Sequence, residues 1–140
     1  MLHSHKSEEM KACISDLVHD QIAGKDVFLR VELNVPLKCS DKTDEIIVEN
    51  TARIRNAVPT IQHLINRGAR CVGLFAHLGR PQGKVNKNLS LKPVANALAK
   101  LLETEVHFVE DCIGQAVEAA VKNVEAQGAF NFQSNIFCNL

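Results

Sequence analysis

The sequence has 140 residues, of which 46% are hydrophobic, and its 16 basic and 16 acidic side chains give no net charge. This length predicts one compact domain with a substantial core and excludes two domains of ordinary size. No stretch is long and apolar enough to cross a bilayer, and the polar N-terminus does not resemble a secretory leader, so we expect a cytoplasmic protein without a membrane partner.

The first half of the chain predicts one strand and one helix. Residues 25–37 are rich in Val, Leu and Phe and predict a buried strand, which delivers Glu32 and Asn34 to the loop at its end. An acidic, turn-rich segment follows. Apolar residues then recur at helical spacing over 52–68, where Pro59 either kinks the helix or marks the first turn of its regular part.

The second half continues the alternation of strands and helices. Residues 69–75 have almost no polar face and predict a strand buried on both sides. Ser90 is a candidate N-cap for a helix over 91–103. A third strand is expected at 105–109 and a third helix at 113–128.

Strands that alternate with helices predict an α/β fold with three layers, in which helices flank a parallel sheet. The last dozen residues, 129–140, carry Phe and Ile without a clear period and form either a final strand or a poorly integrated tail. Ligands of such sheets bind beyond the carboxyl ends of the strands, where loops lead into helices.

Cysteine usage gives no sign of a disulfide framework or of a zinc site. The five cysteines are odd in number and never form a C-x-x-C pair. We therefore interpret them as reduced thiols that mostly fill the core, and we predict no metal site.

The middle of the chain is cationic. No acidic residue occurs between Ala52 and Leu102, whereas nine Lys and Arg residues do, and the acids lie on the flanks, ten before this span and six after it. The segment 76–88, AHLGRPQGKVNKN, places several of these cations directly after a strand. It is either a solvated turn or a binding site for a small anion.

The polar residues expected at this edge of the sheet suit a hydroxylated, anionic metabolite of three or four carbons. Arg53 and Arg80 offer planar guanidinium groups for phosphate or carboxylate, and His77, Asn34 and Glu32 add an imidazole, an amide and a carboxylate. The chain has no P-loop and no G-x-G-x-x-G loop. Tyr and Trp are absent, which argues against a nucleic-acid partner.

The segments VFLRVELNVPL, ARIRNAVPTI, AHLGRPQGK, LSLKPVANALAKLL and EDCIG, in this order, closely resemble the N-terminal domain of phosphoglycerate kinase over residues 13–122. The resemblance implies a Rossmann-like N-terminal lobe that is incomplete here. Residues 1–128 would form part of the substrate-binding domain, and residues 129–140 would be a divergent tail. The nucleotide-binding C-terminal domain of the family would be absent.

The resemblance also implies the ligands and the site. The family transfers a phosphoryl group between 1,3-bisphosphoglycerate and ADP in glycolysis, giving 3-phosphoglycerate and ATP. Mg²⁺ and ADP or ATP belong to the complete family enzyme, and we expect none of them to bind this chain, which should be monomeric. The implied substrate-binding residues are Glu32, Leu33, Asn34, Arg53, His77, Leu78, Gly79 and Arg80; none is assigned a catalytic role.

Two departures from the family pattern predict that the chain alone has no kinase turnover. Glu32 stands where the family has Asp and is one methylene longer, which shifts its carboxylate oxygens. An L-E-N-x-R-F segment that supplies another substrate arginine is replaced by the tail 129–140. Two alternatives to an active enzyme remain: a module that binds phosphoglycerate without chemistry, and an unstable chain with an exposed sheet edge.

Overall fold

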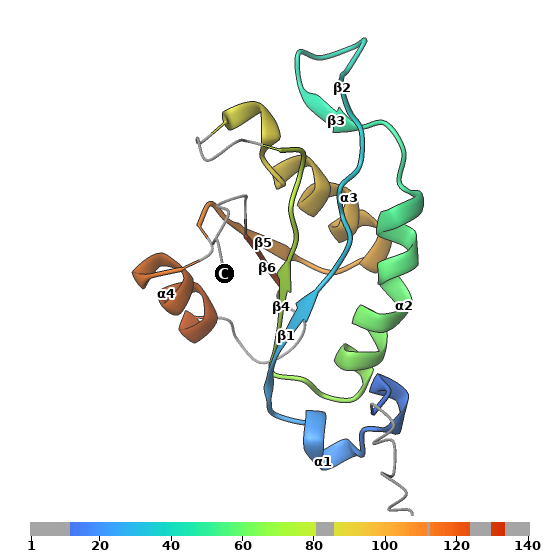
Figure 1. Ribbon diagram of the computed structural model, residues 1–140, viewed down its shortest axis with the longest axis vertical. Helices are drawn as coiled ribbons and strands as arrows, with labels where there is room; N and C mark the ends of the chain where they lie inside the picture. The colour runs from blue at the N-terminus through green and yellow to red at the C-terminus, as the bar shows by residue number, and fades with distance from the viewer. Residues whose placement is uncertain (1–11, 81–85, 112, 124–129, 134–140) are drawn as a thin grey trace, which may run out of the picture.

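The computed structural model describes residues 12–80, 86–111, 113–123 and 130–133 (Figure 1). Its centre is a sheet of four parallel strands in the order β1-β4-β6-β5. These strands are β1 (Asp26–Arg30), β4 (Cys71–Phe75), β5 (Val106–Val109) and β6 (Phe130–Gln133). The predicted α/β fold with a parallel sheet is confirmed.

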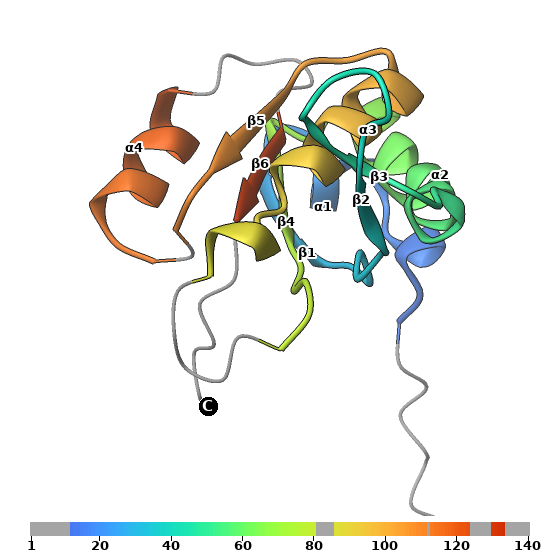
Figure 2. The same cartoon turned by 90° about the horizontal axis from the view of Figure 1, so that it is seen from above.

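Helices lie on both faces of this sheet. The helices α2 (Ala52–Asn66) and α3 (Lys92–Leu102) cover one face, and α4 (Gln115–Asn123) lies on the other (Figure 2). Two short elements, η1 (Ile14–Asp16) and α1 (His19–Ile22), precede β1, and the single turn η2 (Lys87–Leu89) precedes α3. No helix in the described ranges is long and apolar enough to span a membrane.

The main core lies between the sheet and the pair α2 and α3. In β4 the first four residues are buried, as the prediction of a strand covered on both sides requires. Leu74 is fully buried and packs in the same cluster as Ile54 and Ile61 of α2 and Val94 and Leu98 of α3. The apolar stripes at helical spacing therefore face the sheet, which is what makes these segments helical in the folded chain.

The predicted strand over 25–37 is wrong in extent, because β1 ends at Arg30. The apolar side chains beyond this point are still buried, since Leu33 is 0% and Val35 4% exposed, but they pack from a loop. The Glu32 carboxylate accepts the backbone N–H of Asn34 at 3.0 Å, and this local turn replaces the hydrogen bonds of a sheet ladder.

A hairpin occupies the region that the sequence analysis interpreted as a turn-rich loop. Its strands β2 (Leu37–Cys39) and β3 (Ile46–Val48) pair antiparallel in a separate sheet of two strands. Each strand has only three residues, so the sequence shows no recognisable alternation of apolar and polar side chains on either side of the acidic turn.

Several smaller predictions need correction. The helix α2 continues through Pro59, which is therefore not in its first turn. The N-cap of α3 is Leu91 and not Ser90, although the Ser90 hydroxyl still accepts the Lys92 backbone N–H at 3.2 Å. Helix α4 begins at Gln115, two residues later than expected.

The C-terminal segment forms a strand, one of the two alternatives left open for 129–140. Strand β6 lies between β4 and β5 and pairs with both. Residue 129 and residues 134–140 lie outside the described part of the chain, as do residues 124–128 of the helix expected up to 128. Of the three described cysteines, Cys71 is buried, whereas Cys13 and Cys39 are exposed and do not fill the core.

Candidate functional site

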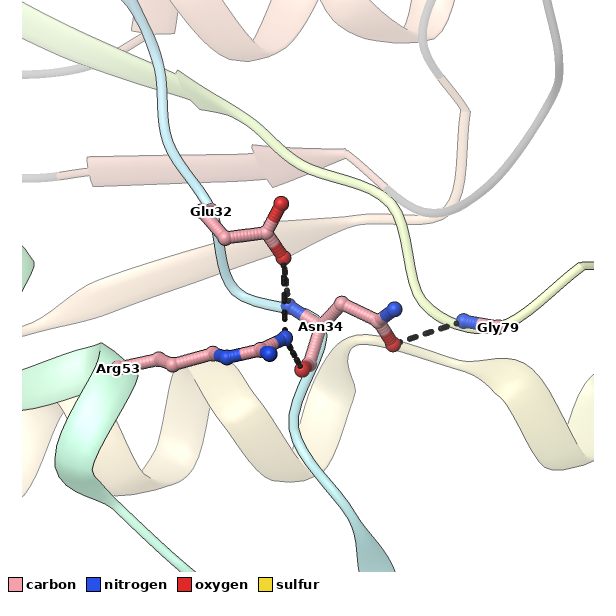
Figure 3. A network of polar contacts seen from close by, with 4 residues as sticks. All are labelled: Glu32, Asn34, Arg53 and Gly79. Carbon is pink, nitrogen blue, oxygen red and sulfur yellow. Dashed lines mark hydrogen bonds and ion pairs between the residues drawn. The ribbon is translucent and has the colours of Figure 1, made fainter.

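The carboxyl ends of β1 and β4 position most of the candidate residues. The two strands are neighbours in parallel register, and Arg30 lies opposite Phe75 where both strands end. The loops that carry Glu32–Asn34 and 77–80 therefore leave the sheet side by side. Helix α2 begins at Ala52, so Arg53 lies in its first turn. Polar contacts connect this turn to the first of the two loops (Figure 3).

Arg53 joins α2 to the loop after β1. Its Nη1 atom lies 3.4 Å from Oε1 of Glu32 and also donates a hydrogen bond to the backbone carbonyl of Asn34. The two charged side chains remain 55% and 60% exposed, so the ion pair adds less than about 1 kcal/mol to stability. It serves to orient the guanidinium group, whose remaining N–H groups can reach a ligand.

Asn34 joins the two loops to each other. Its side-chain oxygen, Oδ1, accepts the backbone N–H of Gly79 at 3.1 Å (Figure 3). The amide nitrogen of the same side chain is thereby left on the opposite side as a donor. Asn34 therefore contacts three segments: its backbone N–H binds Glu32, its carbonyl binds Arg53, and its side chain binds Gly79.

Gly79 is required by the path of the second loop. Its φ of +65° lies in the left-handed region, which is unfavourable for residues with a Cβ. A Cβ at this position would also come within 2.9 Å of Cδ2 of Leu89 in η2. Sequence reasoning missed Leu89, whose side chain packs against the backbone at Gly79, because no motif marks this position.

Leu33 and Leu78 anchor the two loops in the core. Leu33 is 0% exposed and Leu78 is 3% exposed, and both pack in the main hydrophobic cluster. Their buried side chains therefore fix the loops in place and are not accessible to a ligand.

His77 and Arg80 are exposed on the second loop. In the part of the chain that the structure describes, neither is joined to the contacts of Arg53 and Asn34 by a hydrogen bond or an ion pair. The candidate residues thus fall into two groups. Glu32, Asn34, Arg53 and Gly79 are connected by polar contacts, whereas the side chains of His77 and Arg80 take no part in these contacts. Arg80 is followed by residues 81–85, which include Lys84 and lie outside the described part of the chain.

The donors and acceptors at this edge suit an organic anion. Within residues 12–80, 86–111, 113–123 and 130–133, no three His, Cys, Asp or Glu side chains gather into a group that could hold a metal. Exposed guanidinium groups bind phosphate and carboxylate oxygens, and an adjacent carboxylate accepts hydrogen bonds from hydroxyl groups. The arrangement can therefore hold an anion that also carries a hydroxyl group.

Comparison with known proteins gives one consistent result. The sequence pattern of the family described as phosphoglycerate kinase matches residues 14–134. A probable phosphoglycerate kinase of Caenorhabditis elegans is 48% identical over 109 residues, which cover 76% of this chain and 25% of that protein. The phosphoglycerate kinase of Eremothecium gossypii is 42% identical over 120 residues, which cover 86% of this chain and 27% of that protein.

Solved structures agree with the sequence comparisons. The crystal structure of phosphoglycerate kinase from Pyrococcus horikoshii superposes with a TM-score of 0.65 at 29% identity and covers 79% of this chain and 25% of that one. The structure of the Coxiella burnetii phosphoglycerate kinase gives a TM-score of 0.60 at 35% identity over the same shares. The chain thus spans about a quarter of the length of the relatives that it matches.

Proposed function

Because the chain belongs to the phosphoglycerate kinase family, we propose that it binds 3-phosphoglycerate, or the 1,3-bisphosphoglycerate related to it, at the carboxyl edge of its sheet. The observation that carries this proposal is the set of contacts that joins Arg53, Asn34 and Gly79. Three segments that are distant in sequence are held there by polar contacts, with their charged groups exposed to solvent. Such an arrangement orients donors before the ligand arrives, which reduces the entropy lost on binding.

Each side chain has a distinct role in this proposal. Arg53 and Arg80 bind the charged ends of the ligand, which are a phosphate and a carboxylate. The amide nitrogen of Asn34 donates to a ligand oxygen, and the Glu32 carboxylate accepts a hydrogen bond from the ligand hydroxyl. His77 supplies a further donor on the same loop as Arg80.

The longer Glu32 side chain fits this role because of its local geometry. Its Oε1 atom is already fixed by the Asn34 N–H at 3.0 Å and by Arg53 at 3.4 Å. The second oxygen of the carboxylate remains for a hydroxyl group. A carboxylate so close to the guanidinium also weakens the attraction of Arg53 for an anion.

The complete reaction of the family is a phosphoryl transfer between 1,3-bisphosphoglycerate and ADP, and we propose that these 140 residues do not perform it alone. Phosphoryl transfer depends on positioning and on charge stabilisation from both sides of the transferred group. The candidate residues here provide for the phosphoglycerate side only. The Mg²⁺ and nucleotide would be bound by other parts of a complete family enzyme, and the reaction would take place in the cytoplasm.

Thermal unfolding in the presence of 3-phosphoglycerate tests the binding proposal. We expect the midpoint to rise with ligand concentration, because the ligand stabilises only the folded chain. The variant Arg80→Ala should melt at the unliganded midpoint of the parent chain and lose most of the ligand-induced rise. Losing a charged hydrogen-bond donor lowers affinity by about 10- to 100-fold.

Arg55→Ala is the matched control, since Arg55 is exposed on α2 about 200° around the helix from Arg53. It should keep the full ligand-induced rise. An equal loss in both variants would mean that the ligand responds to general positive charge, which contradicts the proposed site. A coupled assay with ADP, Mg²⁺ and 1,3-bisphosphoglycerate tests the second part, and measurable turnover by the purified chain would contradict it.

A further inference from the structure

The single turn η2 lies against the second loop of the candidate site. A Cβ at Gly79 would come within 2.9 Å of Cδ2 and 3.1 Å of Cδ1 of Leu89, so the two methyl groups of Leu89 occupy the space that a side chain at position 79 would take. Both distances are shorter than ordinary van der Waals contact. Leu89 therefore packs directly on the backbone of the loop.

This close packing is particular to Gly79. Four glycines in the described ranges have a positive φ, and a Cβ added at Gly24 or Gly114 would meet nothing within 4 Å. At Gly68 the nearest atom would lie 3.7 Å away, which is an ordinary contact. Among these four turns, only the loop of the candidate site thus has a side chain packed tightly against its glycine.

The turn that carries Leu89 is itself held at both ends. The Asn86 side chain accepts the Asn88 backbone N–H at 3.0 Å, and the Leu89 N–H binds the Asn86 carbonyl at the same distance. Two residues further on, Leu91 is 0% exposed and joins the main hydrophobic cluster at the start of α3. Leu89 therefore extends toward the loop from a fixed support.

Gly79 in turn sets the geometry of two groups that are proposed to bind the ligand. Its N–H binds Oδ1 of Asn34 at 3.1 Å, which leaves the Asn34 amide nitrogen on the opposite side (Figure 3). Arg80 is the next residue, so the direction in which it leaves the loop depends on the backbone dihedral angles of Gly79. A shift of this glycine would therefore move both groups.

We propose that Leu89 is a positioning residue of the ligand site, an inference that rests on the proposed binding of phosphoglycerate. Leu89 does not contact the ligand. Its side chain holds the backbone of Gly79 where the N–H meets Asn34 and where Arg80 is directed toward a charged end of the ligand. The size of the side chain at position 89 therefore determines how much of the time the loop is competent to bind.

The effect on affinity follows from the fraction of chains whose loop is correctly placed. The apparent dissociation constant is the intrinsic constant divided by this fraction. In Leu89→Ala the two methyl groups are gone, so the Gly79 backbone can move toward η2. A loop that is correctly placed about one-tenth of the time binds about tenfold more weakly. Global stability should fall less than for a fully buried leucine, because Leu89 is half-buried.

Isothermal titration with 3-phosphoglycerate measures this effect, and circular dichroism verifies that each variant is folded. We expect Leu89→Ala to bind about tenfold more weakly than the parent chain. Leu89→Met nearly keeps the volume of the side chain and should bind within about threefold of the parent chain. Leu101→Ala is the matched control and should bind like the parent chain, because Leu101 is a half-buried leucine near the end of α3 that is far from η2.

A second measurement reports on the loop without any ligand. Exchange of a loop amide with water follows local opening more than global unfolding. Because the Gly79 N–H is bound to Asn34, its exchange rate, measured by NMR, should rise at least about fivefold in Leu89→Ala. The rate should stay within about twofold of the parent value in Leu89→Met and in Leu101→Ala.

A double-mutant cycle tests the contact itself. Gly79→Ala places a Cβ against the methyl groups of Leu89 in the parent chain, whereas in Leu89→Ala those groups are absent. Gly79→Ala should therefore weaken ligand binding by a smaller factor in the Leu89→Ala background than in the parent chain. Equal factors would mean that the two residues act independently, which contradicts the inference.

The outcomes separate this inference from the proposed function. Absence of binding by the parent chain contradicts the proposed function and with it the effect of Leu89 on affinity, whereas the exchange rate at Gly79 still decides whether Leu89 holds the loop. A parent chain that binds, with a folded Leu89→Ala that binds as tightly, overturns the inference alone. An equal loss of affinity in Leu89→Ala and Leu101→Ala overturns it as well, since the effect would then be one of general stability.

Discussion

The amide of Asn34 offers the sharpest test of how the site is organised. Its Oδ1 atom accepts the Gly79 N–H at 3.1 Å, whereas its nitrogen is proposed to donate to the ligand. Two substitutions separate these roles. Asn34→Ala removes both groups, and Asn34→Asp keeps an oxygen for Gly79 but removes the donor and adds a negative charge.

The contact with Gly79 sets the expected loss of stability in Asn34→Ala. A hydrogen bond of this kind contributes about 1 kcal/mol net, and a half-buried donor left without a partner raises the total to about 2 kcal/mol. The free energy of unfolding should fall by this amount, which lowers the melting midpoint by about 5–9 °C for a chain of this size. Asn34→Asp should melt close to the parent chain.

Binding should show a different order. Isothermal titration with 3-phosphoglycerate should give at least about tenfold weaker binding for both variants, and the weaker of the two should be Asn34→Asp, because its added carboxylate repels the anion. If Asn34→Asp loses as much stability as Asn34→Ala, the oxygen does not hold the second loop. If it binds as tightly as the parent chain, the amide nitrogen does not contact the ligand.

The second loop, the core and the thiols each give one further prediction. Gly79→Ala should lower the free energy of unfolding by about 1–2 kcal/mol in urea titrations, because of its positive φ and its contact with Leu89; no change would mean that the loop is free to move. Leu74→Ala should cost about 2–5 kcal/mol in the same titrations, since it empties a fully buried site, and a loss below about 1 kcal/mol would contradict the packing described. Burial raises the pKa of the Cys71 thiol, whereas a hydrogen bond with the Ser15 side chain lowers the pKa of the Cys13 thiol. Iodoacetamide near pH 8 should therefore label Cys13 well before Cys71 in peptide mapping, whereas equal rates would contradict the burial of Cys71.

The sequence was sufficient to predict the sheet and the helices that cover it. The apolar run in 69–75 and the helical spacing in 52–68 and 91–103 follow directly from which faces are buried, so pattern alone identified these elements. The position of β6 was not predictable in this way. Its place between β4 and β5 depends on pairing with strands that are distant in sequence, which a local pattern does not encode.

The boundary of β1 shows a second limit. Leu33 and Val35 are as apolar and as buried as strand residues, so periodicity extended the predicted strand past Arg30. What ends the strand is a side-chain contact, the Glu32 carboxylate binding the Asn34 N–H, and such competition between side chain and ladder is not visible in an apolar pattern.

Sequence reasoning names the candidate site residues but not the contacts between them. Strand ends and the cationic span of the sequence are sufficient to indicate Asn34, Arg53 and Arg80. That the Asn34 side chain binds Gly79 depends on how two loops meet after separate strands. The same limit applies to Phe28, because an apolar strand residue is expected to be buried, whereas this side chain is 56% exposed in the described part of the chain.

An NMR titration of the ¹⁵N-labelled chain with 3-phosphoglycerate tests the central claim most directly. We expect saturable shifts of the backbone amides at Glu32–Asn34, Arg53 and 77–80, with smaller changes in α4 and β5. The same titration with Arg80→Ala should show these shifts only at much higher ligand concentration. Saturable shifts confined to other parts of the chain, or none at millimolar ligand, would contradict the proposed site.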